Sequence, residues 1–469
     1  MIGKASGDFF LAHDLSVPSR TEKAEKGSRL HYYRGIGIMT QGLQFLATHF
    51  WLYFLLANLL GIGFIVFSQA FLAYRFRKLY TECDLIKTEA PLPHAGIALC
   101  IRGSDSTLKA CIEGLLHQDY PSFEIRIIVD SDADPAFALV KSLLDGQTGY
   151  PITVEKLNAR NDRCGLKNAA LLQAIDGFSA RCKIFAWLDS DIAPQKNWLK
   201  LLVSHVREDS QPVACGIRWF CPPVSSLGAA VRHVWNTGAL TQQLAFGIGW
   251  GGSIACARGF FEKAQLRHLL AKSMFEDTLI SQVVADHGCK LKFVPQATMC
   301  NNESASVFWC RGFFTRQLLG VRLYHKKWRL VLWSGLLSAW ILLGLAVAAI
   351  TRDVYGNGLS GSSFLFFLLI SILYLMALLM RTVENQVLSH LRMGEPGADE
   401  QRFMTKTPWT VFFMAIPITY FLCLFSLIEA AVIHAVTWRG VSYRVNGPFD
   451  IVRQNHLAFE QKTPETASI

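Results

Sequence analysis

Asp189 and Asp191, two carboxylates one residue apart, are the residues whose type and spacing point most directly to chemistry. They follow the apolar run 184–188, which has the length and composition of a buried strand. Ligands of α/β sheets bind where such strands end. Mg²⁺ is commonly held by one or two carboxylates and substrate phosphates, so this pair indicates chemistry on a nucleotide-sugar. The alternative is that Asp189 only caps a turn.

Asp277 is a candidate general base. It precedes a helical pattern at 278–284, so an ordinary N-cap is the alternative role. The adjoining Glu276 adds charge that a cap does not need. Burial beside a second carboxylate raises the pKa of a base toward its working pH, which favours a catalytic role.

Several other residues are candidates for ligand binding. Asp130 and Asp132 lie at the exit of the strand-like run 124–129, with loop solvation as the alternative. Lys167 is a candidate phosphate ligand or else a solvent-facing helix residue. Trp250 is a candidate for stacking on a sugar, although buried packing is the usual role of such a ring.

Alternating strand and helix patterns must position these residues. A strand, helix, strand order predicts a mainly parallel, doubly wound sheet. Asp105 or Ser106 is expected to cap the first of the helices. The expected strands are 96–101, 124–129, 152–157 and 184–189, and the expected helices are 108–116, 135–144 and 166–175.

The composition predicts membrane spans. The chain has 469 residues, of which 51% are hydrophobic and 17% charged, which is too apolar for an ordinary soluble protein. Each apolar run is near or above the roughly 20 residues that cross a bilayer. The first run lacks the pattern of a cleaved signal, so we expect a retained anchor. The runs are 50–74, 330–350, 363–380 and 409–436.

The formal charge of +10 indicates a membrane surface rather than nucleic acid, because the basic residues are dispersed or lie beside the spans. Basic clusters at 75–78 and 326–329 bracket the segment 91–328 and place it in the cytoplasm by the positive-inside rule. We therefore expect a multi-pass protein of a bacterial inner membrane or an endomembrane. Arg439 and Arg444 leave the side of the C-terminus open. The 12 cysteines are expected to be reduced core thiols.

Five motifs resemble those of family-two glycosyltransferases, which have the GT-A fold, and most closely the ceramide glucosyltransferase group. The similarity covers 96–329. Four of the motifs are the run 111–135, the glycine-lysine segment 165–171, Asp189-Ser190-Asp191, and Phe275-Glu276-Asp277 in the place of the catalytic base. The fifth, Gly251-Gly252-Ser253 with Arg258, resembles the acceptor-side loop.

One motif departs from the resemblance. The family usually has Gln/Arg-x-x-Arg-Trp before its later spans, whereas Gln317 follows Arg316 here. Either Arg311 or Arg316 is then the candidate for gripping diphosphate oxygens, since a guanidinium binds them bidentately. A juxtamembrane cation is the alternative role of Arg316.

The resemblance implies a GT-A domain that is Rossmann-like, with a mainly parallel sheet, and that binds a UDP-sugar. Asp130 or Asp132 would read the uracil or ribose, and Asp189 and Asp191 would hold Mg²⁺ or Mn²⁺. Asp277 would be the base, with Trp250, Gly252 and Glu276 on the acceptor side.

The implied reaction is inverting transfer of a hexose, glucose first, to the hydroxyl of a membrane lipid such as ceramide. Diacylglycerol, a hopanoid and a polyprenyl phosphate are alternative acceptors. A catalytically inactive scaffold or lipid-binding protein is the alternative of another class.

The domain limits follow from these patterns. We expect an interfacial helix near 383–391, and a kink or re-entrant break at Pro417. The expected order is an N-terminal tail at 1–43, an anchor at 44–76, the GT-A domain at 91–328, C-terminal membrane helices at 329–437 and a tail at 438–469.

Overall fold

The computed structural model describes residues 20–82, 91–146, 149–158, 161–222, 224–355, 359–393, 407–455 and 459. The chain divides into two compact units, Met1–Ile62 and Gly63–Ile469. Helix α1 (Arg20–Thr81) runs from the first unit into the second. The expected tail at 1–43 is therefore wrong for 20–43, since no proline interrupts the helix between Arg20 and Thr81. Residues 1–19 lie outside the described residues.

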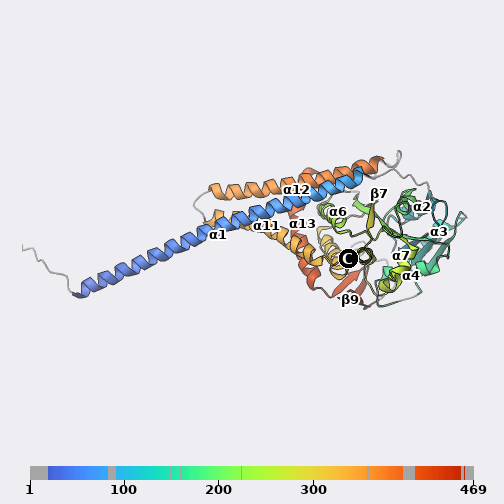
Figure 1. The fold of residues 1–469 in the computed structure, drawn as a ribbon, viewed down its shortest axis with the longest axis horizontal. Coiled ribbons are helices and arrows are strands. Elements are labelled where there is room, and N and C mark those ends of the chain that lie inside the picture. Colours follow the sequence, from blue (N-terminus) through green and yellow to red (C-terminus); the bar gives the residue numbers. More distant parts are fainter. Residues whose placement is uncertain are drawn as a thin grey trace, which may run out of the picture. The chain divides into compact units, whose positions relative to one another are not determined.

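The second unit contains a seven-stranded sheet with the order β3-β2-β1-β4-β6-β5-β7 (Figure 1). Only β6 runs antiparallel to its neighbours, β4 and β5, among these strands. The predicted α/β class with a mainly parallel sheet is confirmed. The strands are β1 (Ala95–Ile101), β2 (Phe123–Val129), β3 (Ile152–Lys156), β4 (Ile184–Leu188), β5 (Val213–Phe220), β6 (Ser253–Ala257) and β7 (Leu291–Asn301).

Both faces of the sheet are buried. Phe185 and Trp187 of β4 enter one core cluster with α4 (Leu166–Gly177) and α9 (Glu276–Asp286). The alternate residues of β4 enter a second cluster, because consecutive side chains of a strand face opposite ways. That second cluster contains residues of α2 (Leu108–Leu116), α3 (Pro135–Leu144) and α5 (Trp198–Val203). Polar groups that bind ligands are therefore left to the ends of the strands.

The start of α2 differs from the prediction. Its N-cap is Thr107, which makes no side-chain capping hydrogen bond, so neither Asp105 nor Ser106 has that role. Asp105 instead pairs with Arg439, more than three hundred residues away in the chain.

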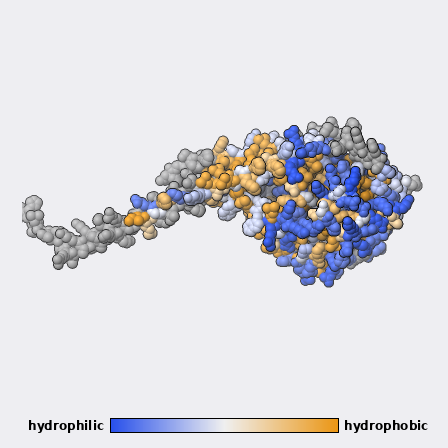
Figure 2. Space-filling model, viewed as in Figure 1, coloured by the Kyte–Doolittle hydropathy of each residue, from blue (hydrophilic) through white to orange (hydrophobic). Residues whose placement is uncertain are grey.

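Four helices are long and apolar enough to cross a membrane, as predicted: Leu56–Thr81, Trp328–Ala348, Leu365–Leu391 and Trp409–Val432. The last three lie in α11 (Trp328–Tyr355), α12 (Leu359–Met393) and α13 (Trp409–Val432). Figure 2 shows hydrophobic side chains gathered over α11 and α12 and hydrophilic ones over the α/β part. Pro417 lies inside α13, which the structure describes as one helix without the expected break.

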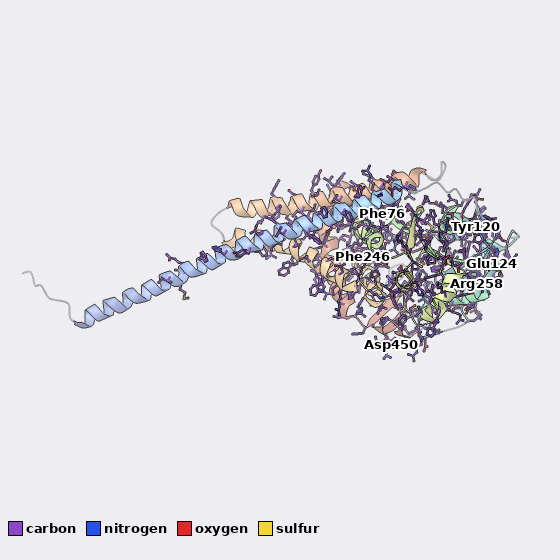
Figure 3. All side chains as sticks on the ribbon, viewed as in Figure 1. Phe76, Tyr120, Glu124, Phe246, Arg258 and Asp450 are labelled. Atoms are coloured by element: carbon purple, nitrogen blue, oxygen red, sulfur yellow. The ribbon has the colours of Figure 1, made fainter. Side chains whose placement is uncertain are left out.

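The amphipathic stretch near 383–391 is not a separate helix, because its residues continue α12. Val383 and Val387 are buried in a cluster with Phe76 of α1 and Trp219 of β5. Figure 1 shows α12 beside this part of α1, and Figure 3 labels Phe76. The apolar face that predicted a membrane-surface helix therefore packs against the protein.

Four further helices belong to the second unit. α6 (Leu227–Phe246) and α10 (Val307–Tyr324) pack against α13. The Thr419 hydroxyl of α13 donates to the carbonyl of Val231 in α6 at 3.2 Å. Short helices α7 (Arg258–Lys263) and α8 (Leu266–Leu270) follow β6.

Residues 435–453 form a second, three-stranded antiparallel sheet with the order β10-β9-β8, where a tail was expected. Asp450 marks it in Figure 3. Its strands are β8 (Ala435–Trp438), β9 (Val441–Gly447) and β10 (Asp450–Arg453). The buried Tyr443 hydroxyl accepts the amide N–H of Leu166 at 3.1 Å, so this sheet packs on the α/β part. Residues 456–458 and 460–469 lie outside the described residues.

Every cysteine that the structure describes is a free thiol, which agrees with the reduced state predicted from their number and spacing. Burial raises the pKa of the thiols of Cys164 and Cys182 to about 12, so they are protonated at neutral pH.

Candidate active site

A cavity of about 1030 Å³ opens where β1, β2 and β4 end. Ile101, Asp130 and Asp189, which end or directly follow these strands, line its polar part. Its apolar part is lined by residues of α6, α10, α11 and α13, among them Phe246, Val321, Leu330 and Leu427. One space therefore joins a cluster of carboxylates to an apolar channel between helices.

All but one of the residues predicted from the sequence line this cavity. They are Asp130, Lys167, Asp189, Asp191, Trp250, Gly252, Glu276, Asp277, Arg311 and Arg316. The exception is Asp132, whose exposed carboxylate pairs with Lys156 at 2.9 Å outside the cavity. Asp132 lies three residues beyond the end of β2, where the chain has already turned toward α3.

Asp191 is half-buried beside the end of β4. Its Oδ2 atom accepts a hydrogen bond from Asn301 Nδ2 at 2.9 Å. Its Oδ1 atom is buried and has no hydrogen-bond partner among the described residues. Burial, together with the charges of Asp189 and Glu303, raises the pKa of Asp191 to about 7. The site therefore carries an unsatisfied carboxylate oxygen next to other carboxylates.

Asp189 differs because it has a cationic partner. Burial opposes ionisation, but Lys167 at 2.5 Å holds the pKa of Asp189 below its usual value. The acidic residues here offer only hard oxygen ligands, and one such oxygen, in Asp191, lacks a partner. This set fits Mg²⁺ or Mn²⁺.

Gly252 is required by the close approach of Asp189. The backbone N–H of Asp189 donates to the Gly252 carbonyl at 3.1 Å. A Cβ atom on Gly252 would lie 2.7 Å from Asp189 Oδ2 and 2.2 Å from Trp250 Cζ2. Any larger residue would displace the carboxylate or the indole ring.

Lys167 links two carboxylates at the start of α4. Its Nζ atom lies 2.5 Å from Asp189 Oδ1 and 2.5 Å from Glu276 Oε1. Burial, with added repulsion from Asp277 and Asp189, raises the pKa of Glu276 to about 7 although Lys167 opposes the shift. The Lys167 ammonium group therefore neutralises part of the negative charge of Asp189 and Glu276.

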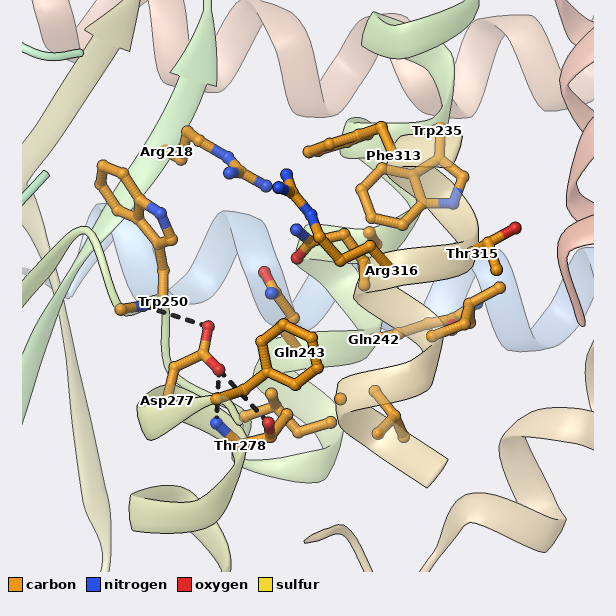
Figure 4. A pocket seen from close by; sticks show the side chains of 18 of the residues that line it. Arg218, Trp235, Gln242, Gln243, Trp250, Asp277, Thr278, Phe313, Thr315 and Arg316 are labelled. Atoms are coloured by element: carbon orange, nitrogen blue, oxygen red, sulfur yellow. Dashed lines mark hydrogen bonds between the residues drawn. The ribbon is translucent and has the colours of Figure 1, made fainter. Parts of the chain in front are cut away.

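Asp277 is the second residue of α9, whose N-cap is Phe275, so the alternative role as a cap is wrong. Its Oδ1 atom accepts the N–H of Thr278 at 2.6 Å, and Oδ2 accepts the N–H of Gly251 at 3.3 Å (Figure 4). These bonds fix the carboxylate at the cavity wall beside Trp250. An oxygen held in this way is placed to accept a proton from a bound hydroxyl.

The two candidate arginines of α10 have different surroundings. Arg311 is about half exposed, and its Nε atom lies 3.2 Å from Glu429. Arg316 has no acidic partner among the described residues, and its guanidinium carbon lies 5.0 Å from the centre of the Trp438 ring. Burial, with repulsion from Arg218 and Arg439, lowers the pKa of Arg316 to about 10.

Asp130 and Trp250 both line the cavity but are largely buried. Asp130 forms an ion pair with Arg102 at the end of β2. Trp250 is 6% exposed, and the guanidinium carbon of Arg218 lies 5.7 Å from the centre of its ring. Trp250 therefore packs in the core and also contributes to the cavity wall, where it could contact a ligand.

Several lining residues were missed from the sequence. Arg218 was detectable as a lone charge inside the apolar strand β5, and Figure 4 shows its guanidinium directed toward that of Arg316. Asn301 was detectable as a polar residue at the end of β7. Asp105 and Arg439 carried no local signal, because only the fold brings them together.

Comparisons with known proteins are consistent with these observations. The model of the family described as "Glycosyl transferase family 21" matches residues 56–448. A ceramide glucosyltransferase of Komagataella phaffii is 29% identical over 93 residues, which are 20% of this chain and 18% of that protein. The chain thus spans less than a fifth of the length of this curated relative.

A solved structure also matches, with a TM-score of 0.44 and 14% sequence identity. It is the mannosyltransferase PcManGT from Pyrobaculum calidifontis in complex with GDP-Man and Mn²⁺, and the match covers 80% of this chain and 97% of that one.

Proposed function

This chain belongs to glycosyl transferase family 21, and we propose that it transfers a hexose, with glucose the first choice, from a UDP-sugar to the hydroxyl of a membrane lipid. Ceramide is the acceptor that we propose first, because the curated relative is a ceramide glucosyltransferase. The transfer inverts the configuration of the sugar.

The observation that carries this proposal is the continuity of one cavity from carboxylates to apolar helices. Asp189, Asp191 and Asp277 line its polar part, whereas Leu330 and Leu427 line its apolar part. Both apolar residues belong to helices long and apolar enough to span a membrane. A lipid whose chains lay between these helices would bring its hydroxyl toward Asp277. A water-soluble acceptor would not need such an apolar channel.

The donor would occupy the polar part. Asp130 at the strand exit would contact the uracil or the ribose. Arg316 would bind diphosphate oxygens, since it is half-buried, lines the cavity and has no acidic partner among the described residues. Lys167 would add positive charge near the phosphates. Asp132 is left out of this assignment because it lies outside the cavity.

The reaction is a direct displacement. Asp189 and Asp191 would hold Mg²⁺ or Mn²⁺, which when bound would neutralise charge on the departing diphosphate. Asp277 accepts the proton of the acceptor hydroxyl while the hydroxyl oxygen attacks the anomeric carbon. The bond from that carbon to the diphosphate breaks on the opposite side, and UDP leaves with the bonding electrons.

We also propose that the catalytic part, 91–328, faces the cytoplasm of a multi-pass protein, in a bacterial inner membrane or an endomembrane. Basic clusters at 75–78 and 326–329 flank this part and support the orientation. The anchor keeps its proposed limits of 44–76. The membrane helices proposed for 329–437 end at Val432, because Ala435–Trp438 form strand β8. Because β8 to β10 pack on the α/β part, we further propose that the C-terminus lies on the same side.

The test measures UDP release and lipid product with purified protein, UDP-glucose, Mn²⁺ and ceramide in detergent. Product with ceramide supports the proposal, and product only with diacylglycerol, a hopanoid or a polyprenyl phosphate would replace the acceptor. Equally fast transfer to a soluble sugar would overturn lipid specificity. If the protein released no UDP with any of these acceptors, it would be an inactive scaffold or a lipid-binding protein.

A further inference from the structure

The turn between β8 and β9 enters the candidate active site from the C-terminal end of the chain. Trp438 pairs with Val441, so Arg439 and Gly440 form a two-residue hairpin loop. Their φ angles are 46° and 75°, and positive values at both positions define a type I′ turn. Trp438 and Arg439 both line the cavity.

Arginine is an unfavourable choice for this turn. Asn-Gly is the preferred pair at these positions, and a non-glycine residue with positive φ is uncommon. Gln265 is the other non-glycine residue with positive φ in the described part of the chain. Strained residues of this kind cluster at functional sites, because the surrounding structure must hold them in place.

The side chain of Arg439 is held inside the site by specific partners. Nη1 donates to the Arg102 carbonyl at 2.7 Å and to Asp105 Oδ1 at 3.3 Å, and Nη2 donates to Asp105 Oδ2 at 2.9 Å. These bonds use three of the five N–H donors of a guanidinium. The two remaining donors have no partner among the described residues.

Two other arginines surround the same space. Arg218 and Arg316 have no acidic hydrogen-bond partner among the described residues, and the buried Nε atom of Arg218 has no partner of any kind there. Trp438 packs against Arg316, and its ring centre lies 6.2 Å from that of Phe275, next to Glu276. Guanidinium groups from three separate elements therefore face one cavity, and two of them, Arg218 and Arg316, have no acidic partner among the described residues. Such a cluster suits a multiply charged anion.

We propose that Arg439 is a donor-binding residue whose guanidinium contacts the diphosphate of the nucleotide-sugar, and that the β8–β9 hairpin is a wall of the donor site. This inference rests on the proposed function. The proposal adds the β8–β9 hairpin to the active site. This hairpin follows α13, the last apolar helix, and is distant in sequence from the α/β part. Donor binding would accordingly depend on the docking of the C-terminal sheet.

The test compares Arg439→Asn with Arg444→Asn. The first variant creates the favoured Asn-Gly turn, which offsets part of the stability lost with the Arg439–Asp105 ion pair. The second removes an equal charge from the exposed face of β9, outside the cavity. Full-length protein in detergent with Mn²⁺ is titrated with UDP and, separately, with uridine.

We expect Arg439→Asn to weaken UDP binding about 10- to 100-fold, because hydrogen bonds to charged groups are lost. Uridine binding should stay unchanged, as should UDP binding by Arg444→Asn. Unchanged UDP affinity in Arg439→Asn would overturn the inference. An equal loss for UDP and uridine would also overturn it by showing a structural role.

The wild-type protein separates this inference from the proposed function. If it binds GDP but not UDP, the proposed donor is wrong, and GDP with guanosine then decides the role of Arg439 by the same criteria. If it binds neither diphosphate, both the proposed function and the inference fail.

Discussion

Lys167 and Glu276 form an ion pair with 2.5 Å between Nζ and Oε1, although their side chains are only 14% and 5% exposed. Removing one partner from such a buried pair is costly, because the other charge is left without compensation. The pair joins the start of α4 to the start of α9 and so connects the strand-exit aspartates to the candidate base. We therefore expect the charge state of the Lys167–Glu276 pair to affect the free energy of unfolding.

The first prediction concerns the pH dependence of that stability. Burial raises the pKa of Glu276 from 4.5 in the unfolded chain to about 7 in the folded protein. Between pH 4.5 and about 7 the folded protein therefore keeps Glu276 protonated while the unfolded chain has released that proton. The contribution of Glu276 to the free energy of unfolding is thus present in full below pH 4.5 and is lost as pH rises through about 7.

Between pH 4.5 and about 7, we expect the free energy of unfolding of the wild type to fall by on the order of 1 kcal/mol more than that of Glu276→Gln. Unfolding of both proteins in chelator, without nucleotide, at several pH values measures the two slopes. Parallel slopes would show that Glu276 does not titrate as described.

The second prediction separates the two arginines of α10. Arg316→Gln should weaken UDP binding about tenfold or more, because a half-buried guanidinium without an acidic partner among the described residues is lost from the cavity. Arg311→Gln should change it little, since Arg311 forms a half-exposed pair with Glu429. Calorimetric titration with UDP measures both affinities, and the opposite ranking would assign the diphosphate contact to Arg311.

The third prediction concerns the metal. Transfer should stop in chelator and return on addition of Mn²⁺ or Mg²⁺, because Asp189 and Asp191 present hard oxygen ligands at the end of β4. Asp191→Ala should lose UDP-sugar binding together with its response to metal. Full metal-dependent turnover by that variant, measured as UDP release, would remove Asp191 from the site.

The α/β core and the main acidic residues could be predicted from the sequence. The continuous apolar run of β4 and the helical spacing of α2 are local signals, and parallel strands carry their exits to one edge. That is why Asp130, Asp189 and Asp191 were expected near one another. The prediction for Asp132 was wrong because its position two residues after Asp130 is enough to place it outside the cavity.

The C-terminal part of the site was not predicted, although one local signal existed. Val441, Tyr443 and Val445 alternate with less buried residues, and Pro448 follows this run at the turn into β10. No local pattern could show that this sheet docks on α4 or that Arg439 reaches Asp105. Those contacts depend on tertiary packing, which also covers the apolar face of α12 that predicted a membrane-surface helix.

Asp277 carries the central claim, which is that one carboxylate removes the proton of a lipid hydroxyl. Asp277→Asn is the sharpest variant because its amide oxygen can still accept the N–H of Thr278, so that only the longer bond from Gly251 at 3.3 Å is lost. An amide cannot take up the proton, and a positioned base typically contributes about 10² to 10⁴ in rate. The fold and the binding of UDP-glucose should therefore remain near normal.

The decisive measurement is the turnover of UDP-glucose and lipid acceptor by folded Asp277→Asn, with its UDP affinity determined in parallel. The account predicts near-normal affinity and a loss of turnover of at least about a hundredfold. Turnover close to that of the wild type would contradict it and shift the role of base to Glu276.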